Sequence, residues 1–417
     1  MINNNFLLRL ISSIGIIVAA STPSWASNAV NIYSARHYQS DDKLYAAFTK
    51  RTGIQVNRIE AADEALLERL RSEGTKSPAD VLILVDAARL SRAATEGLFA
   101  PSDSESLRER IPENMRSSKE AQGYAWWGFS KRARVIVYNK QRFSGSAPQS
   151  YASLADARFK SAVCTRSAAH PYMLSLIASQ IEHRGESATL SWAKAVVGNF
   201  ARPPRGGDTD QIRATASGEC GVALSNTYYL ARLMRSSKPE DQEVIRKVGF
   251  VWPDQDDKGT HVNVTGGGMV KHAKNREAAM RFLEFMASDE AQQMLADGNN
   301  EWPTVPSVKI NNPALDAMGS FKADKLPIAT IGARQSAAVK LVDQADGASL
   351  ALASSDDFDL NQIFGCCQFR FNGRTRRRVA RGNPSIPNLI HRRKISDIGK
   401  EDLRLKNLGL IAVRLSK

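Results

Sequence analysis

The 417-residue chain lacks the short motifs that mark common enzyme classes. It has no G-x-S-x-G elbow of a serine hydrolase, no phosphate-binding P-loop, no H-E-x-x-H zinc helix and no C-x-x-C pair. Two glycine clusters, Gly206-Gly207 and Gly266-Gly267-Gly268, stand alone, and we interpret them as turns or hinges. We therefore expect a protein that binds a ligand and has no catalytic activity.

Long hydrophobic runs are missing after the N-terminus. There, Arg9 precedes an apolar stretch, Ile11 to Ala20, that is too short to cross about 30 Å of hydrocarbon. Small side chains at Ser24 and Ala26 follow it and provide a cleavage site. We interpret residues 1–26 as a signal peptide, cleaved after about Ala26, and expect the mature protein in the periplasm.

Acidic residues are scarce in the last part of the chain. From Gly365 to the end there are 14 lysines and arginines against three acidic residues, so this segment carries +11 of the total +14. The rest of the chain, at +3, lacks the basic surface that nucleic-acid binding requires, and we expect no nucleic-acid partner. Residues 346–417 are interpreted as a basic tail. A disordered extension, a shifted reading frame and a nucleic-acid arm remain open for it.

Cysteine is also scarce, with Cys164, Cys220, Cys366 and Cys367 only. Cys164 ends one strand-like run and Cys220 precedes another, so neighbouring strands would bring them together. In an exported protein this favours a Cys164–Cys220 disulfide over two buried free thiols. Adjacent Cys366 and Cys367 cannot easily bridge each other.

Strand-like and helix-like segments alternate along the chain, which predicts an α/β fold with a parallel sheet. Strands are expected over residues 30–33, 54–59, 79–85, 134–138, 160–164, 221–224 and 248–252. Helices are expected to begin near Asp41, Glu64, Ala87, Pro171, Glu186, Gln211 and Arg276.

The pattern divides into two lobes, because the strand–helix alternation starts again in the middle of the chain. Lobe 1 is predicted to contain residues 27–127 and 259–310, and lobe 2 residues 128–258 and 311–345. The chain would cross between them near Trp127 and again near Gly259, as extended hinge strands. A ligand is expected in the cleft between the lobes.

Tyrosines follow several of the predicted strands. Tyr38, preceded by His37, follows the first strand, Tyr172 follows the strand that ends at Cys164, and the pair Tyr228-Tyr229 follows a later one. Strand ends are where open α/β sheets bind ligands. A trivalent hard cation can displace a phenolic proton and gain a strong oxygen ligand. Packing of the rings, or stacking on a sugar, explains the same residues.

Several separate stretches resemble the periplasmic ferric-iron-binding proteins of bacterial ABC transporters, especially the cyanobacterial branch. The resemblance covers about residues 29–345. The matching stretches are Tyr33-Ser-Ala-Arg-His-Tyr38, Ser77-Pro-Ala-Asp-Val81, Phe129-Ser-Lys-Arg-Ala-Arg-Val-Ile-Val-Tyr-Asn139, Asn199-Phe-Ala-Arg202, Asp208-Thr-Asp-Gln211, Ser225-Asn-Thr-Tyr-Tyr229 and Gly259-Thr-His-Val-Asn-Val264.

The resemblance implies a type II periplasmic-binding-protein fold that carries Fe³⁺ as cargo to a membrane permease, as a monomer. The ligands it implies are His37, Tyr38, Tyr172, Tyr228 and Tyr229, with Arg132 and Arg232 as cations behind them. The run before Tyr172, Ser167-Ala-Ala-His-Pro171, departs from the Ser/Asn-rich run of the family and would bring His170 near the site. The alternatives are a binding protein for a sugar, polyamine or oxyanion, and a redox enzyme that uses the same cleft.

Overall fold

The computed structural model describes residues 28–36 and 38–346, all within one compact unit of the chain. Its strands are β1 (Ala29–Ser34), β2 (Gln55–Glu60), β3 (Val81–Leu84), β4 (Lys119–Glu120), β5 (Gly123–Tyr124), β6 (Trp127–Asn139), β7 (Val163–Cys164), β8 (Val222–Asn226), β9 (Val248–Val251), β10 (Val262–Met269) and β11 (Trp302–Pro303). Its helices are α1 (Asp41–Thr52), α2 (Asp63–Glu73), α3 (Ala87–Thr95), α4 (Glu105–Arg110), α5 (Lys140–Phe143), α6 (Pro171–Arg184), α7 (Glu186–Gly198), α8 (Asp208–Ser217), α9 (Thr227–Met234), α10 (Pro239–Lys247), α11 (Arg276–Met286), α12 (Asp289–Asn299), α13 (Pro313–Met318), α14 (Ile328–Ala333) and α15 (Gln335–Asp346).

The main sheet has the strand order β2-β1-β3-β10-β6-β8-β7, with β9 and β11 also paired to β6. Pairing is parallel among β1, β2 and β3 and between β7 and β8, whereas β6 and β10 run antiparallel to their neighbours. The prediction of an α/β fold is confirmed, and the sheet is mixed rather than purely parallel. The two antiparallel strands are those that the sequence predicted near the chain crossings.

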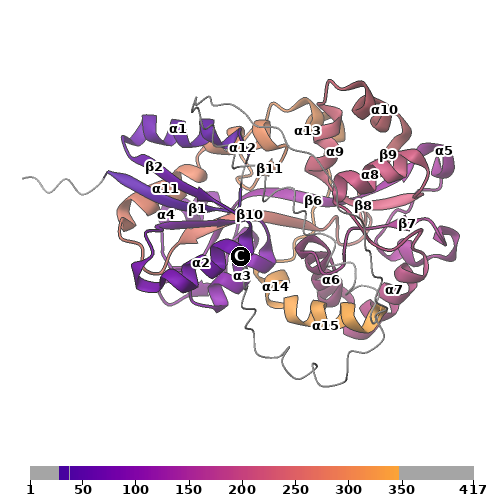
Figure 1. The fold of residues 1–417 in the computed structure, drawn as a ribbon, viewed down its shortest axis with the longest axis horizontal. Coiled ribbons are helices and arrows are strands. Elements are labelled where there is room, and N and C mark those ends of the chain that lie inside the picture. The colour runs from indigo at the N-terminus through magenta and orange to yellow at the C-terminus, as the bar shows by residue number, and fades with distance from the viewer. Residues whose placement is uncertain (1–27, 37, 347–417) are drawn as a thin grey trace, which may run out of the picture. The chain divides into compact units, whose positions relative to one another are not determined.

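Strand β6 connects the two halves of the sheet (Figure 1). Its first part, Trp127 to Ala133, pairs with β10, and its second part, Arg134 to Asn139, pairs with β8 and β9. One uninterrupted 13-residue strand therefore belongs to both sets of strands. This is the geometry expected of a hinge strand. The change of partner lies between Ala133 and Arg134, further along the strand than the crossing predicted near Trp127.

Helices cover the apolar strands on the β1–β3 side. All four residues of β3 are buried, as a strand covered on both faces requires. On α1, the side chains of Leu44, Tyr45 and Phe48 are buried, and the Phe48 ring meets Phe282 of α11 edge-on, 5.2 Å between ring centroids. Helix α1 ends at Thr52, and Gly53, whose φ is 73°, caps its C-terminus in the left-handed conformation that glycine adopts easily.

The triple glycine is not a turn, which corrects one of the two interpretations made from the sequence, a turn or a hinge. Gly266, Gly267 and Gly268 all lie inside β10. A Cβ atom on Gly266 would come within 2.6 Å of the Trp127 carbonyl oxygen, and one on Gly268 within 2.1 Å of that of Ala125. The glycines are therefore needed because the neighbouring backbone approaches too closely for any side chain.

The predicted disulfide is present. Cys164 ends β7, Cys220 precedes β8, and their sulfur atoms are bonded across a sequence separation of 56 residues. Strand β7 is shorter than the sequence predicted, with Val163 and Cys164 only, yet its parallel pairing with β8 brings the two cysteines together. Cys366 and Cys367 lie outside the described residues.

The last described helices complete the packing. Helix α14 packs against α3 and α6, and α15 packs against α6 and α7. On α15, Ala338, Leu341 and Val342 are buried.

Among the described residues, no helix combines the length and the apolar character needed to cross a membrane.

A chain truncated after Asp346 should melt within a few degrees of the full chain, because the apolar face of α15 is retained. A chain truncated after Arg334 should lose at least about 3 kcal/mol of stability, since three buried apolar side chains go with the helix. Thermal melting of both truncated chains beside the full chain measures this. A large fall in melting temperature for the first truncation would show that residues 347–417 stabilise the fold.

Candidate metal centre

The loop after β1 places Tyr38 next to a buried arginine. The Arg36 guanidinium donates to both carboxylate oxygens of Asp41, at 2.8 and 3.0 Å, and to Glu301 Oε2 at 3.0 Å. Its carbon Cζ lies 5.2 Å from the centroid of the Tyr38 ring. Arg36 is only 1% exposed, so these charged hydrogen bonds hold the start of the loop in place. His37 lies outside the described residues, and its role stays a prediction.

Tyr172 lies in the first turn of α6, and His170 caps that helix. The Nδ1 atom of His170 accepts the Tyr172 backbone N–H at 3.2 Å, and the two rings meet edge-on with centroids 4.4 Å apart. Burial lowers the pKa of His170 well below its ordinary value, with the cation of Arg166 adding to the effect. His170 therefore lies against Tyr172, and a neutral ring suits its role as a hydrogen-bond acceptor.

Tyr228 and Tyr229 form part of the first turn of α9, directly after β8. The hydroxyl of Tyr228 donates to the hydroxyl of Tyr172 at 3.0 Å. The rings of Tyr228 and Tyr229 are tilted against each other, with centroids 4.2 Å apart. Two strand ends, those of β7 and β8, thus bring three phenols into one cluster, as the sequence predicted.

Arg232 connects this cluster to the tyrosine that follows β1. Its Cζ lies 5.9 Å from the ring centroid of Tyr38 and 5.7 Å from that of Tyr229. Tyr38 and Tyr229 also interact electrostatically. Four tyrosines from separate parts of the chain therefore converge on one place, and the cation of Arg232 faces two of them.

Arg132, from β6, lies behind Tyr172. Its Cζ is 5.6 Å from the Tyr172 ring centroid, and its Nη1 atom donates to Thr265 Oγ1 at 3.1 Å. The carboxylates of Asp86 and Glu301 lie 3.7 and 4.0 Å from its guanidinium. Arg132 is 2% exposed, and its Nε and Nη2 atoms have no hydrogen-bond partner. A buried cation next to the phenols is the arrangement that favours their ionised form.

Burial keeps three of these phenols, those of Tyr38, Tyr172 and Tyr228, protonated at neutral pH. It raises the pKa of Tyr172 and of Tyr228 well above the ordinary value near 10, and the phenols of Tyr38 and Tyr229 raise both further. Burial also raises the pKa of Tyr38, and the carboxylate of Glu301 adds to this. A cation that binds these oxygens must therefore displace their protons, and among cations this favours a small ion of high charge.

The sequence missed three charged side chains of this site. Arg36 precedes His37 and Tyr38, and Arg166 lies 5.1 Å from the Tyr172 ring centroid. Both stand within six residues of a predicted ligand, so their closeness to the motifs could have identified them. Glu301 could not be found in this way, because 265 residues separate it from Arg36, its ion-pair partner.

No group of three or more His, Cys, Asp or Glu side chains among the described residues could hold a metal ion. In this part of the chain, a metal centre would therefore depend on tyrosine oxygens.

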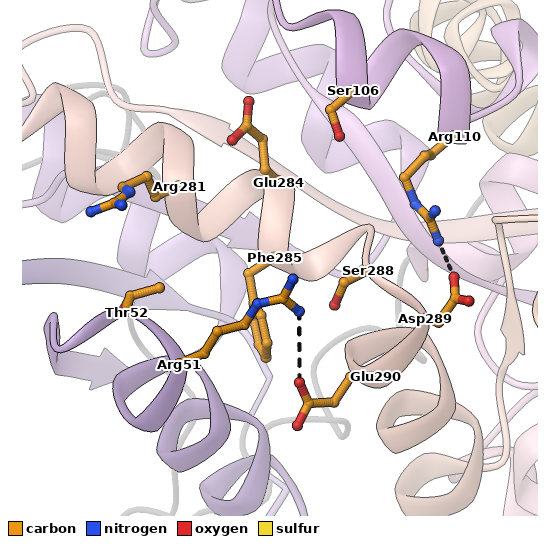
Figure 2. A pocket seen from close by; sticks show the side chains of 10 residues that line it. All are labelled: Arg51, Thr52, Ser106, Arg110, Arg281, Glu284, Phe285, Ser288, Asp289 and Glu290. Carbon is orange, nitrogen blue, oxygen red and sulfur yellow. Dashed lines mark hydrogen bonds and ion pairs between the residues drawn. The ribbon is translucent and has the colours of Figure 1, made fainter.

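A separate cavity of about 710 Å³ lies between the end of α1, helix α4 and the α11–α12 turn, and it contains no tyrosine. Figure 2 shows its charged side chains pairing with one another, Arg51 with Glu290 and Arg110 with Asp289.

Known proteins are similar to this chain in sequence. The family described as bacterial extracellular solute-binding protein matches residues 43–324. Iron uptake protein A1 of Synechocystis is 45% identical over 78% of this chain and 89% of its own length. The major ferric iron-binding protein of Neisseria meningitidis is 25% identical over 79% of this chain and 95% of its own length.

Solved structures of iron-binding proteins are similar to this chain in fold as well as in sequence. A Trichodesmium protein, IdiA or FutA in complex with iron and citrate ligands, is 49% identical, with a TM-score of 0.73 over 76% of this chain and 99% of its own. The ferric binding protein from Campylobacter jejuni is 40% identical, with a TM-score of 0.71 over the same shares. The α/β fold, the strand β6 common to both halves of the sheet and the converging tyrosines agree with these matches. The chain therefore belongs to the bacterial extracellular solute-binding proteins, in the branch that contains the periplasmic ferric-iron-binding proteins of type II fold.

Proposed function

We propose that this protein captures ferric iron outside the cytoplasmic membrane and delivers it to the permease of an ABC transporter. The observation that carries the proposal is the convergence of Tyr38, Tyr172, Tyr228 and Tyr229, with Arg232 facing two of them. Relatives at 45% and 49% identity are named for iron uptake or contain bound iron, which supports the same cargo. Iron is here a transported ligand and not a catalytic cofactor.

The proposed ligands are the four tyrosines together with His37. Phenolate is a hard oxygen donor and suits Fe³⁺, whereas copper(I) would favour thiolates. Several phenolates in one site repel each other, and the buried cation Arg132 and the nearby Arg232 reduce this repulsion. The arginines lie beside the rings, where they stabilise negative oxygens without competing to coordinate the metal.

Binding is expected to close the two lobes on the metal. Tyr38 follows β1 in the first lobe, whereas Tyr172, Tyr228 and Tyr229 follow strands of the second. Neither half of the site supplies a complete set of ligands, so Fe³⁺ binds the closed arrangement more tightly and shifts the population toward it. The permease would then recognise the closed, loaded protein.

We also propose that the protein works in the periplasm and does not catalyse a reaction. Residues 1–26 act as a signal peptide, and the mature chain works in the periplasm, in keeping with the extracellular family to which it belongs. It is a monomeric binding protein without enzymatic activity and without a nucleic-acid partner. The lobe boundaries are proposed at the residues given above, with β6 as one of the hinge strands.

Two other functions use the same cleft. A binding protein for a sugar, polyamine or oxyanion would take up an organic or anionic ligand, and a redox enzyme would turn over iron with a reductant. The cluster of phenols and the relatives at 45% and 49% identity, which are named for iron uptake or contain bound iron, favour a metal cargo. We therefore place ferric iron ahead of both.

The purified protein should turn red-orange on addition of Fe³⁺ and bind one iron per chain, because tyrosinate bound to Fe³⁺ absorbs visible light. Absorption spectroscopy with measurement of the iron content checks this. Fe³⁺ should be supplied with a weak chelator so that it stays in solution. A colourless protein that retains no iron would overturn the proposal and favour an organic ligand.

Replacing Tyr228 and Tyr229 together by Phe should abolish iron binding and cost only about 1 kcal/mol of stability. The rings are kept, and the hydrogen bond lost is that between Tyr228 and Tyr172. The matched control is Tyr138→Phe, a tyrosine of β6 outside the cluster, which should bind iron normally. Iron titration and thermal melting of both variants give the answer, and normal binding by the double variant would assign the pair to packing.

Iron affinity should fall as the pH falls. The pKa values of Tyr172 and Tyr228 are raised above their ordinary value, so both phenols are protonated at neutral pH, and each bond that they form to iron releases a proton. For each proton released, the affinity for free Fe³⁺ should decrease roughly tenfold per pH unit. Competition with a chelator of known affinity between about pH 6 and about pH 8 measures this slope, and an affinity independent of pH would exclude phenolate ligands.

A further inference from the structure

Asp208, the first residue of α8, is a fully buried carboxylate that lies behind the tyrosine cluster. Its Oδ2 atom accepts hydrogen bonds from Arg134 Nη1 at 2.5 Å and from the Asn226 backbone N–H at 2.7 Å. Its Oδ1 atom accepts from Arg166 Nη1 at 3.3 Å. One carboxylate therefore connects strand β6, the start of α9 and the loop after β7.

The first of these connections fixes the helix that carries two tyrosines. Asn226 is the residue directly before α9, and its side-chain oxygen accepts a hydrogen bond from Arg134 at 3.1 Å. Arg134 and Asp208 thus hold both the side chain and the backbone N–H of this residue. Tyr228 and Tyr229 follow within three residues, so the position of Asn226 determines where their hydroxyls lie.

The second connection fixes a cation against the third tyrosine of the same cluster. Arg166 is 9% exposed, and its Nε atom has no hydrogen-bond partner. Its guanidinium lies 5.1 Å from the Tyr172 ring centroid, and it interacts electrostatically with Tyr228 and Tyr229 as well. Arg132 lies near the same ring, so Tyr172 has two buried cations beside it.

We propose that Asp208 is the positioning residue of this half of the iron site, and that Arg166 is the cation that it holds against Tyr172. The proposal rests on the function proposed above and adds two residues that do not touch the metal. Asp208 sets the distance between Tyr172 and the Tyr228-Tyr229 pair, because it is bonded to a neighbour of each. Arg166 stabilises the negative charge that the phenols gain when iron binds.

An ordinary buried ion pair would contain the same contacts, and the experiment must separate the two roles. A pair that only stabilises the fold would change the melting temperature and leave the spectrum of the bound iron unchanged. A pair that positions and neutralises the ligands would change the iron affinity and the wavelength of the iron–tyrosinate band. Measurements on the iron-loaded protein therefore distinguish them.

The central variant is Arg166→Met, which keeps the length of the side chain and leaves Asp208 paired with Arg134. We expect at least about a tenfold loss of iron affinity, equivalent to one pKa unit of phenolate stabilisation, with a shifted absorption band. Arg166→Lys keeps the charge and should recover part of the affinity. The matched control is Arg213→Met in α8, whose partner Asp241 lies away from the tyrosines, and it should bind iron like the wild type.

Asp208→Asn tests the carboxylate itself. The control on the same helix is Asp210→Asn, since the Asp210 carboxylate accepts a hydrogen bond from the Gly207 backbone N–H at the start of the helix. Asp208→Asn should weaken iron binding at least as much as Arg166→Met. If the Asp208→Asn variant does not fold, the iron affinity and the absorption band of the Arg166→Met variant test the inference by themselves. Normal affinity and an unshifted band in Arg166→Met would overturn the inference, whereas a wild-type protein that binds no iron would overturn the proposed function itself.

Discussion

Strand β6 has to satisfy two different sets of hydrogen-bonding partners along one extended backbone. The change from β10 to β8 and β9 takes place between Ala133 and Arg134. Side chains alternate along a strand, so Arg132 and Arg134, on either side of this change, share one face. The guanidinium of Arg132 lies beside the ring of Tyr172, and that of Arg134 pairs with Asp208. The strand that joins the two halves of the sheet therefore also carries two of the arginines around the tyrosine cluster.

Buried charge explains much of the remaining arrangement. Arg36, Arg132 and Arg134 are at most 2% exposed, and an unpaired charge at such positions would be strongly destabilising. Asp41, Asp86, Asp208 and Glu301 are buried with them and supply the opposite charge. These buried ion pairs adjoin the tyrosine cluster, because Arg36 lies beside the ring of Tyr38 and Arg132 beside that of Tyr172.

The local structure was largely predictable from the sequence. Helix α6 begins at Pro171 and helix α1 at Asp41, as expected. The disulfide and the strand-end positions of the tyrosines also agree with the prediction. These features depend on neighbouring residues, on caps and on hydrophobic periodicity, which a sequence displays directly.

Other features depend on residues that meet only after folding. The sequence determined the alternation of strands and helices, the export signal that we infer and the residue types at the strand ends. Only the tertiary structure decided that Gly266–Gly268 lie within β10, that Glu301 pairs with Arg36 and that Asp208 links Arg166 to the start of α9. Backbone packing and buried ion pairs join residues far apart in the chain, and no local pattern records which distant partner each of them will find.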